Sequence, residues 1–310
     1  MELFFTALSQ MAYLFTFIFL GYLLMKIRGL PEGTAKVVSK LENNLLLPAM
    51  VFNTFTNQFT TKTLTTAWRS ILVSVALMVV MVVVAMLSSR LLTKDGYLRK
   101  IYAYGLSFSN FGFMGYAVVK AIFPEFYMDY IIYTMPMWAG IYIWATPTLL
   151  MPEGEGGLKE RLKNFLNPMF ISLVIGAVFG LCGLSRYIPE FAQNVINATE
   201  SCMSPLAMML VGITLADVKL KTVFKDLGVY TVSLVRLAAI PVIFILVAKM
   251  IPFVRVDYVC ALVTLSMPMG LSSIVIPAAY GNDTSKASGL ALVSHAISCI
   301  TIPLVFLWGC

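Results

Sequence analysis

The chain has 310 residues, of which 59% are hydrophobic and only 12% are charged. Soluble domains carry about 25% charged residues, so this composition excludes an ordinary soluble protein and predicts a chain that faces mainly lipid or other membrane helices. The net charge of +7 does not indicate nucleic-acid binding, because the basic residues cluster at the ends of the apolar segments.

Ten apolar segments are long enough to cross a bilayer, which takes about 20 residues each. They run near residues 4–25, 35–56, 69–92, 99–123, 126–150, 166–185, 189–216, 227–250, 257–281 and 287–309. The basic residues Lys26 and Arg28 follow the first segment instead of preceding it, which predicts an uncleaved first helix and not a signal peptide. The fold class we predict is therefore an all-α membrane protein.

A charged and Gly-rich stretch separates the fifth segment from the sixth. It predicts a cytoplasmic linker at 151–164 between a first five-helix repeat, 1–150, and a second, 165–310. If the N-terminus lies outside, the inner loops hold fifteen lysines and arginines and the outer loops hold six. Since basic residues collect on the cytoplasmic side, this ratio predicts that both termini lie outside.

The two halves share a set of residues at a nearly constant offset. The pairs are Glu42 and Glu200, Pro48 and Pro205, Gly112 and Gly270, and Pro147 and Pro303, with offsets of 156 to 158 residues. A repeat of five helices must be inverted in the membrane, and inverted repeats are typical of secondary transporters.

Two apolar segments are interrupted at matching positions in the two halves. The first break reads S-F-S-N-F-G-F-M-G-Y over residues 107–116, and the second reads L-S-M-P-M-G-L-S-S over 265–273. Broken helices are tolerated at membrane depth only where the freed backbone lines a cavity or a ligand, and paired breaks indicate a transporter binding site. The substrate-binding candidates are Ser109, Asn110, Gly112, Pro268, Met269, Gly270, Ser272 and Ser273.

Ionisable residues inside the spans are functional hypotheses by default. Arg236 could hold an anionic substrate or act as a structural counter-ion to a helix C-terminus. Glu42 and Glu200 could relay protons or pair at a helix interface, and His295 could titrate near neutral pH or be a hydrogen-bonded packing residue. Asn53 is a candidate for the cavity wall.

The sequence contains no Walker loop, nucleophile elbow, H-E-x-x-H motif or Rossmann fingerprint, so we predict no enzyme activity and no cofactor. Its one histidine and five cysteines lack metal-ligand spacing, so we predict no metal site. The cysteines are predicted to be free, buried thiols.

The order of several loose motifs resembles the auxin efflux carrier family, the bacterial relatives of the plant PIN auxin exporters. The motifs are L-L-P-A-M-V-F-N-T (46–54), N-F-G-F-M-G (110–115), N-P-M-F-I-S-L-V-I-G (167–176), P-L-A-M-M-L-V-G-I-T-L-A (205–216), V-R-L-A-A-I-P (235–241), P-M-G (268–270), A-A-Y-G (278–281) and I-P-L (302–304). Two positions depart from the plant proteins, which have proline where this chain has Ser109 and glutamine where it has Met269. The expected site is therefore less polar than in the plant exporters.

The resemblance implies two inverted five-helix repeats with crossed, broken helices four and nine, a fold like that of the bile-acid symporters and NhaA. It implies a scaffold domain, about 4–56 and 166–216, through which a homodimer forms, and a transport domain, about 69–150 and 227–309. It also implies elevator-type alternating access, carboxylate-type substrates and a bacterial plasma-membrane location.

Three functions stay open from the sequence. The first is a carrier of a small organic anion, such as a dicarboxylate, a monocarboxylate or an indole acid. The second is a sodium-coupled symporter of the bile-acid type, and the third is a membrane sensor with a transporter fold. We favour the first with H⁺ coupling or uniport over Na⁺ coupling, because no carboxylate lies in sequence beside Asn110, Ser272 and Ser273.

Overall fold

The computed structural model describes residues 2–151, 168–216, 223, 225–251 and 253–309, and within these residues it is helical apart from turns, loops and one isolated β-bridge. In the first half the helices are α1 (Glu2–Lys26), α2 (Thr34–Leu41), η1 (Glu42–Leu46), α3 (Leu47–Gln58), α4 (Thr61–Thr66), α5 (Trp68–Leu92), α6 (Gly96–Ser107), η2 (Phe111–Gly115), α7 (Tyr116–Ile122), η3 (Pro124–Phe126), α8 (Tyr127–Gly140) and η4 (Ile141–Leu150). In the second half they are α10 (Pro168–Leu181), η5 (Leu184–Tyr187), α11 (Glu190–Ser201), α12 (Met203–Ala216), α14 (Leu227–Leu234), η6 (Val235–Ala239), α15 (Ile240–Ala248), α16 (Arg255–Ser266), α17 (Ser272–Ala279) and α18 (Ser285–Gly309).

Helices occupy each of the ten apolar segments that the sequence predicts. In the described part of the chain, four helical stretches are long and apolar enough to cross a membrane by length and composition alone: Trp68–Leu92, Glu190–Ala216, Leu227–Ala248 and Ser285–Gly309. The predicted linker at 151–164 lies, apart from Met151, outside the described residues.

Several long helices widen into π-helical turns. The turn η4 contains Pro147. The turns η1 and η6 each end two residues before a proline, at Pro48 and Pro241 respectively. Proline has no N–H to donate to the preceding turn, and short π-helical turns are frequent at functional sites.

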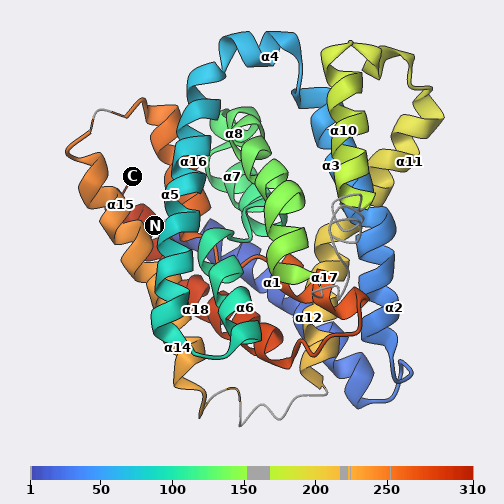
Figure 1. The fold of residues 1–310 in the computed structure, drawn as a ribbon, viewed down its shortest axis with the longest axis vertical. Helices are drawn as coiled ribbons and strands as arrows, with labels where there is room; N and C mark the ends of the chain where they lie inside the picture. Colours follow the sequence, from blue (N-terminus) through green and yellow to red (C-terminus); the bar gives the residue numbers. More distant parts are fainter. Residues whose placement is uncertain (1, 152–167, 217–222, 224, 252, 310) are drawn as a thin grey trace.

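The same helix pairs recur in the two halves. The helix α1 packs along α12, and α3 packs along α10 and α11; these are the helices of the predicted scaffold. Within the predicted transport domain, α5 packs against α6 and α8 in the first half, and α14 packs against α18 and α15 against α16 in the second. Further contacts join this domain to the scaffold helices, among them those of α17 with α2 and of α18 with α1 and α12. Figure 1 shows α3, α10 and α11 together on one side and α5 and α15 on the other, with α7 and α8 between them.

The helix α5 presents an apolar surface to the outside of the bundle. Only Ser74, Met81, Ala85 and Ser89 of this helix are buried, and most of the valines and leucines of α5 are exposed. An exposed apolar face of this size is what a bilayer covers, so α5 is a lipid-facing helix.

The cysteine prediction was correct in part. The four described cysteines form no disulfide, and Cys260 is buried, but Cys182 and Cys202 are exposed. Cys182 follows the last residue of α10, and Cys202 lies between α11 and α12. The prediction of buried thiols was therefore wrong for these two.

Candidate functional site

The two predicted helix breaks lie in contact with each other. The helix α6 ends at Ser107 and η2 begins at Phe111, while α16 ends at Ser266 and α17 begins at Ser272. The two segments between these helix ends meet in an antiparallel β-bridge between Ser109 and Met269.

Each break supplies backbone partners to the other. The Asn110 N–H donates to the Pro268 carbonyl oxygen at 2.7 Å, and the Gly270 N–H donates to that of Phe108 at 3.1 Å. Backbone groups freed by the breaks therefore pair across the crossing instead of facing lipid, as a broken helix at membrane depth requires.

Two of the predicted glycines allow this close packing. A Cβ atom at Gly270 would lie 3.0 Å from the Phe108 carbonyl oxygen and 3.1 Å from that of Ser109. At Gly112 a Cβ atom would overlap the indole ring of Trp138. Glycine therefore serves close approach at both positions.

Arg236 holds the C-terminal ends of both broken helices. Its side chain is buried, and its guanidinium donates to three carbonyl oxygens: those of Leu106 at 2.8 Å, Thr264 at 3.1 Å and Met267 at 3.2 Å. Carbonyl groups at a helix C-terminus carry partial negative charge. Of the two roles that the sequence left open, this geometry supports the counter-ion to helix C-termini.

Asn110 is hydrogen-bonded to the single histidine of the chain. The distance from Asn110 Nδ2 to His295 Nε2 is 2.9 Å, and His295 Nδ1 lies 2.7 Å from the Ala291 carbonyl oxygen. That carbonyl can only accept, so Nδ1 carries the hydrogen and Nε2 accepts from the Asn110 amide. The Oδ1 atom of Asn110 is buried and has no hydrogen-bond partner in the part of the chain that the structure describes.

The serines of the breaks are held by the protein. Ser109 Oγ donates to the Thr264 carbonyl at 2.6 Å, and Ser273 Oγ donates to the Gly270 carbonyl at 2.8 Å. Ser272 is hydrogen-bonded to the Tyr104 hydroxyl. Met269 and Pro268 lie inside the crossing, and Met269 is buried.

Asn53 and Glu200 belong to a separate polar cluster between α3 and α11. Asn53 Nδ2 donates to Glu200 and to Asn197 Oδ1, the latter at 3.1 Å, and Gln193 Nε2 donates to Asn53 Oδ1 at 2.8 Å. The structure therefore brings these two predicted residues together.

Glu42 occupies a third location. It is fully buried in η1, which packs against α17 and α12, and neither of its carboxylate oxygens has a hydrogen-bond partner within the described residues.

The sequence analysis missed the aromatic side chains that surround the crossing. Trp138 packs edge-on against Phe111 with ring centroids 4.7 Å apart, and Tyr142 stacks on Trp138 at 5.7 Å. The Tyr130 hydroxyl donates to the Phe111 carbonyl at 3.2 Å. Aromatic residues are spread through many apolar segments, so no local signal marked these.

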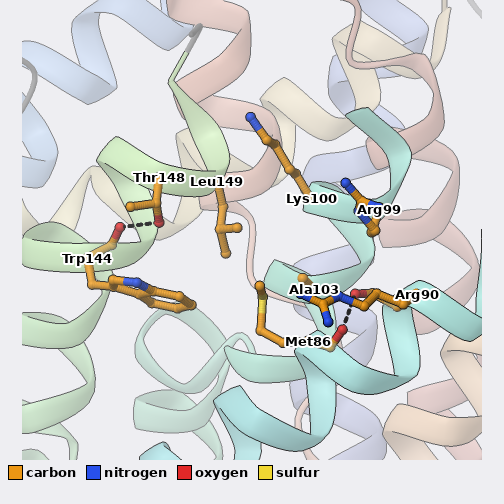
Figure 2. A pocket seen from close by; sticks show the side chains of 9 residues that line it. Met86, Arg90, Arg99, Lys100, Ala103, Trp144, Thr148 and Leu149 are labelled. Atoms are coloured by element: carbon orange, nitrogen blue, oxygen red, sulfur yellow. Dashed lines mark hydrogen bonds between the residues drawn. The ribbon is translucent and has the colours of Figure 1, made fainter. Parts of the chain in front are cut away.

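A cavity of about 430 Å³ is lined by residues of α5, α6 and η4, among them the basic Arg90, Arg99 and Lys100 and the apolar Trp144 and Leu149 (Figure 2). A second cavity, of about 520 Å³, shares the lining residues Arg99, Lys100 and Leu149 with the first. Their positive charge favours anions. Within the described residues no group of three His, Cys, Asp or Glu side chains could hold a metal ion.

The model of one protein family, described as "Membrane transport protein", matches the chain twice, over residues 6–161 and 157–306. The chain belongs to the membrane transport protein family. Membership indicates a transporter rather than an enzyme, and together with the apolar helices it supports a membrane location. No curated protein matches the chain. The two matched ranges correspond closely to the two predicted halves.

Proposed function

We propose that this protein is a secondary transporter of a small organic anion carrying a carboxyl group, and that the helix crossing is its substrate site. One observation carries the proposal: the two broken helices pair at Ser109 and Met269, and the Oδ1 atom of the buried Asn110 there has no partner among the described residues. Orphaned polar atoms beside irregular backbone are typical of a ligand site.

The electrostatics of the crossing favour an anion. The C-terminal ends of α6 and α16 are compensated by Arg236. The segments beginning at Phe111 and Ser272 start at the same place, and helix N-termini carry partial positive charge. The balance therefore favours a carboxylate over a cation.

We further propose elevator-type alternating access. The scaffold would be α1, α2–α3, α10 and α11–α12, and the mobile part would be α5–α8 with η4, and α14–α18. Extensive packing of α1 on α12 and of α3 on α10 supports this division. The scaffold would also form a homodimer, in a bacterial plasma membrane with both termini outside.

Flux into proteoliposomes tests the proposal. Labelled benzoate, indole-3-acetate and succinate serve as probes, with choline replacing Na⁺ in a parallel arm. We expect saturable uptake of at least one acid without a Na⁺ requirement, and we expect Asn110→Ala to abolish it while the protein still inserts. Saturable binding without flux would instead support a sensor, and a strict Na⁺ requirement would support the symporter of the bile-acid type.

A further inference from the structure

The hydrogen-bond pattern of Asn110 has the wrong polarity for an anion. One of its two amide N–H groups donates to His295 Nε2, and Oδ1, which has no hydrogen-bond partner among the described residues, is an acceptor. A carboxylate is also acceptor-only, so the two cannot hydrogen-bond. At Oδ1 the site therefore suits a ligand atom that donates, such as the O–H of a neutral acid, and not a carboxylate oxygen.

We propose that His295 Nε2 binds the proton that is coupled to transport, and that this proton reverses the Asn110 amide. This inference rests on the proposed function. A protonated Nε2 is a donor, so Asn110 must turn its Oδ1 toward the imidazolium. The amide N–H groups then face the position where Oδ1 was orphaned, and the crossing becomes a donor site beside one added positive charge.

The proton balance follows from this exchange. One proton from solvent adds to Nε2, the Nδ1–H stays on the Ala291 carbonyl, and the carboxylate binds as an anion. The loaded site therefore gains no net charge with a monocarboxylate. Release of the carboxylate removes the counter-charge of the imidazolium, so the proton leaves with it on the same side.

Arg236 does not supply this variable charge. Its guanidinium donates from all three nitrogens to carbonyl oxygens of the two broken helices, so its charge compensates the ends of these helices. His295, in contrast, has one nitrogen whose partner can serve either as donor or as acceptor.

The titratable and charged side chains around α18 do not hydrogen-bond to the His295 ring. Titratable or charged side chains on α18 and on the described elements packed against it are Lys286 and Cys299 of α18, Tyr13, Tyr22 and Lys26 of α1, Tyr230 of α14, Arg236 of η6, and Arg255, Asp257, Tyr258 and Cys260 of α16. Helices α12, α15 and α17 bring none. The two ring nitrogens are engaged by Ala291 and Asn110, so none of these side chains is the ring's hydrogen-bond partner.

The chain offers a direct spectroscopic test because His295 is its only histidine. In protein labelled with ¹⁵N-histidine and ¹⁵N-asparagine and reconstituted in nanodiscs, we expect a protonated Nδ1 and an unprotonated Nε2 at pH 8. On acidification Nε2 gains a proton, and the side-chain amide signal that Asn110→Ala removes shifts with the same midpoint. An Nε2–H tautomer at pH 8, or an Asn110 signal that ignores the imidazole titration, would overturn the proposal without touching the proposed function.

Flux provides the second test. With pyranine inside proteoliposomes to report protons, wild-type uptake of the acid transported in the first assay should carry protons inward. Its rate should rise by up to about tenfold for each unit of falling external pH while the site is mostly unprotonated. The variant His295→Asn can still donate to Ala291 but cannot take up a proton, so its flux should lose both the pH response and the proton signal.

The two proposals fail in different ways. If the wild-type protein moves none of the acids, the proposed function fails, and the spectra alone decide the behaviour of His295. If His295→Asn keeps the wild-type pH response while Glu42→Gln loses it, the proton resides on Glu42 and the His295 proposal is wrong.

Discussion

Replacing Arg236 should weaken the crossing itself. In Arg236→Met the carbonyls of Leu106 and Met267 lose the partner that the structure gives them, whereas the Thr264 carbonyl keeps Ser109 Oγ. Each buried group left unpartnered costs about 1–3 kcal/mol, so the loss is about 2–6 kcal/mol. That is a large part of the 5–15 kcal/mol typical of folded proteins.

Thermal unfolding followed by tryptophan fluorescence measures this loss. At about 2 °C per kcal/mol for a chain of this size, the midpoint should fall by about 4–12 °C. Arg236→Lys should fall between wild type and Arg236→Met, because one ammonium group cannot reproduce the planar fork that reaches three carbonyls. The exposed Arg69 provides the matched control, and Arg69→Met should change stability by no more than about 0.5 kcal/mol.

One result would refute this reasoning. If Arg236→Met unfolds at the wild-type temperature but loses the stabilisation that a transported acid confers, then Arg236 binds the substrate and does not hold the helix ends.

Three further predictions follow from single contacts. Gly112→Ala should cost about 1–3 kcal/mol by overpacking against Trp138, whereas Gly96→Ala, which meets no neighbour, should not lower the unfolding midpoint. Burial alone would raise the pKa of Asp226, but Lys286 and the N–H groups of Gly228 and Val229 lower it overall. Its contribution to stability is therefore present above the unfolded value near 4 and lost as pH falls through the lower pKa of the folded state. Because Asn also caps helices well, Asp226→Asn loses mainly the partly exposed ion pair with Lys286, and the resulting stability deficit of about 0.2–1 kcal/mol should vanish in acid. The double variant Arg90→Gln, Arg99→Gln should take up organic anions more slowly than wild type at low ionic strength but not at high salt, because salt screens the attraction of these arginines for the anion. Lys94→Gln is the control: Lys94 does not line the cavity, so this variant should keep the wild-type rate. An equal loss of rate at high salt would contradict the electrostatic role of the two arginines.

The crossing could be predicted because its signals are local. Glycine, proline and serine interrupt two apolar runs, and each interrupts a helix by its own chemistry, whatever it later contacts. The pairing of Asn110 with Pro268 then follows from the need of both breaks for backbone partners.

Partners distant in sequence could not be predicted in the same way. The carbonyl of Leu106 lies 130 residues from Arg236, and His295 lies 185 residues from Asn110. The repeat gives a wrong expectation here. Glu42 and Glu200 occupy matching positions in the two halves, yet Glu200 accepts a hydrogen bond within an amide cluster, whereas the carboxylate of Glu42 has no hydrogen-bond partner in the described part of the chain. Repeat symmetry relates backbones, while each side chain finds neighbours that the other half does not duplicate.

The composition of the crossing predicts which acids it prefers. Asn110 Oδ1 has no partner among the described residues, but the hydroxyls of Ser109 and Ser273 already donate to backbone carbonyls. The first break also carries Phe111, whose ring packs against Trp138. A site with one adaptable polar group and aromatic walls pairs one carboxylate and leaves a second without donors, which costs several kcal/mol for an unpaired buried charge. We therefore expect unlabelled benzoate to compete for uptake at least about tenfold more strongly than succinate, and stronger competition by succinate would show that a second polar anchor completes the site.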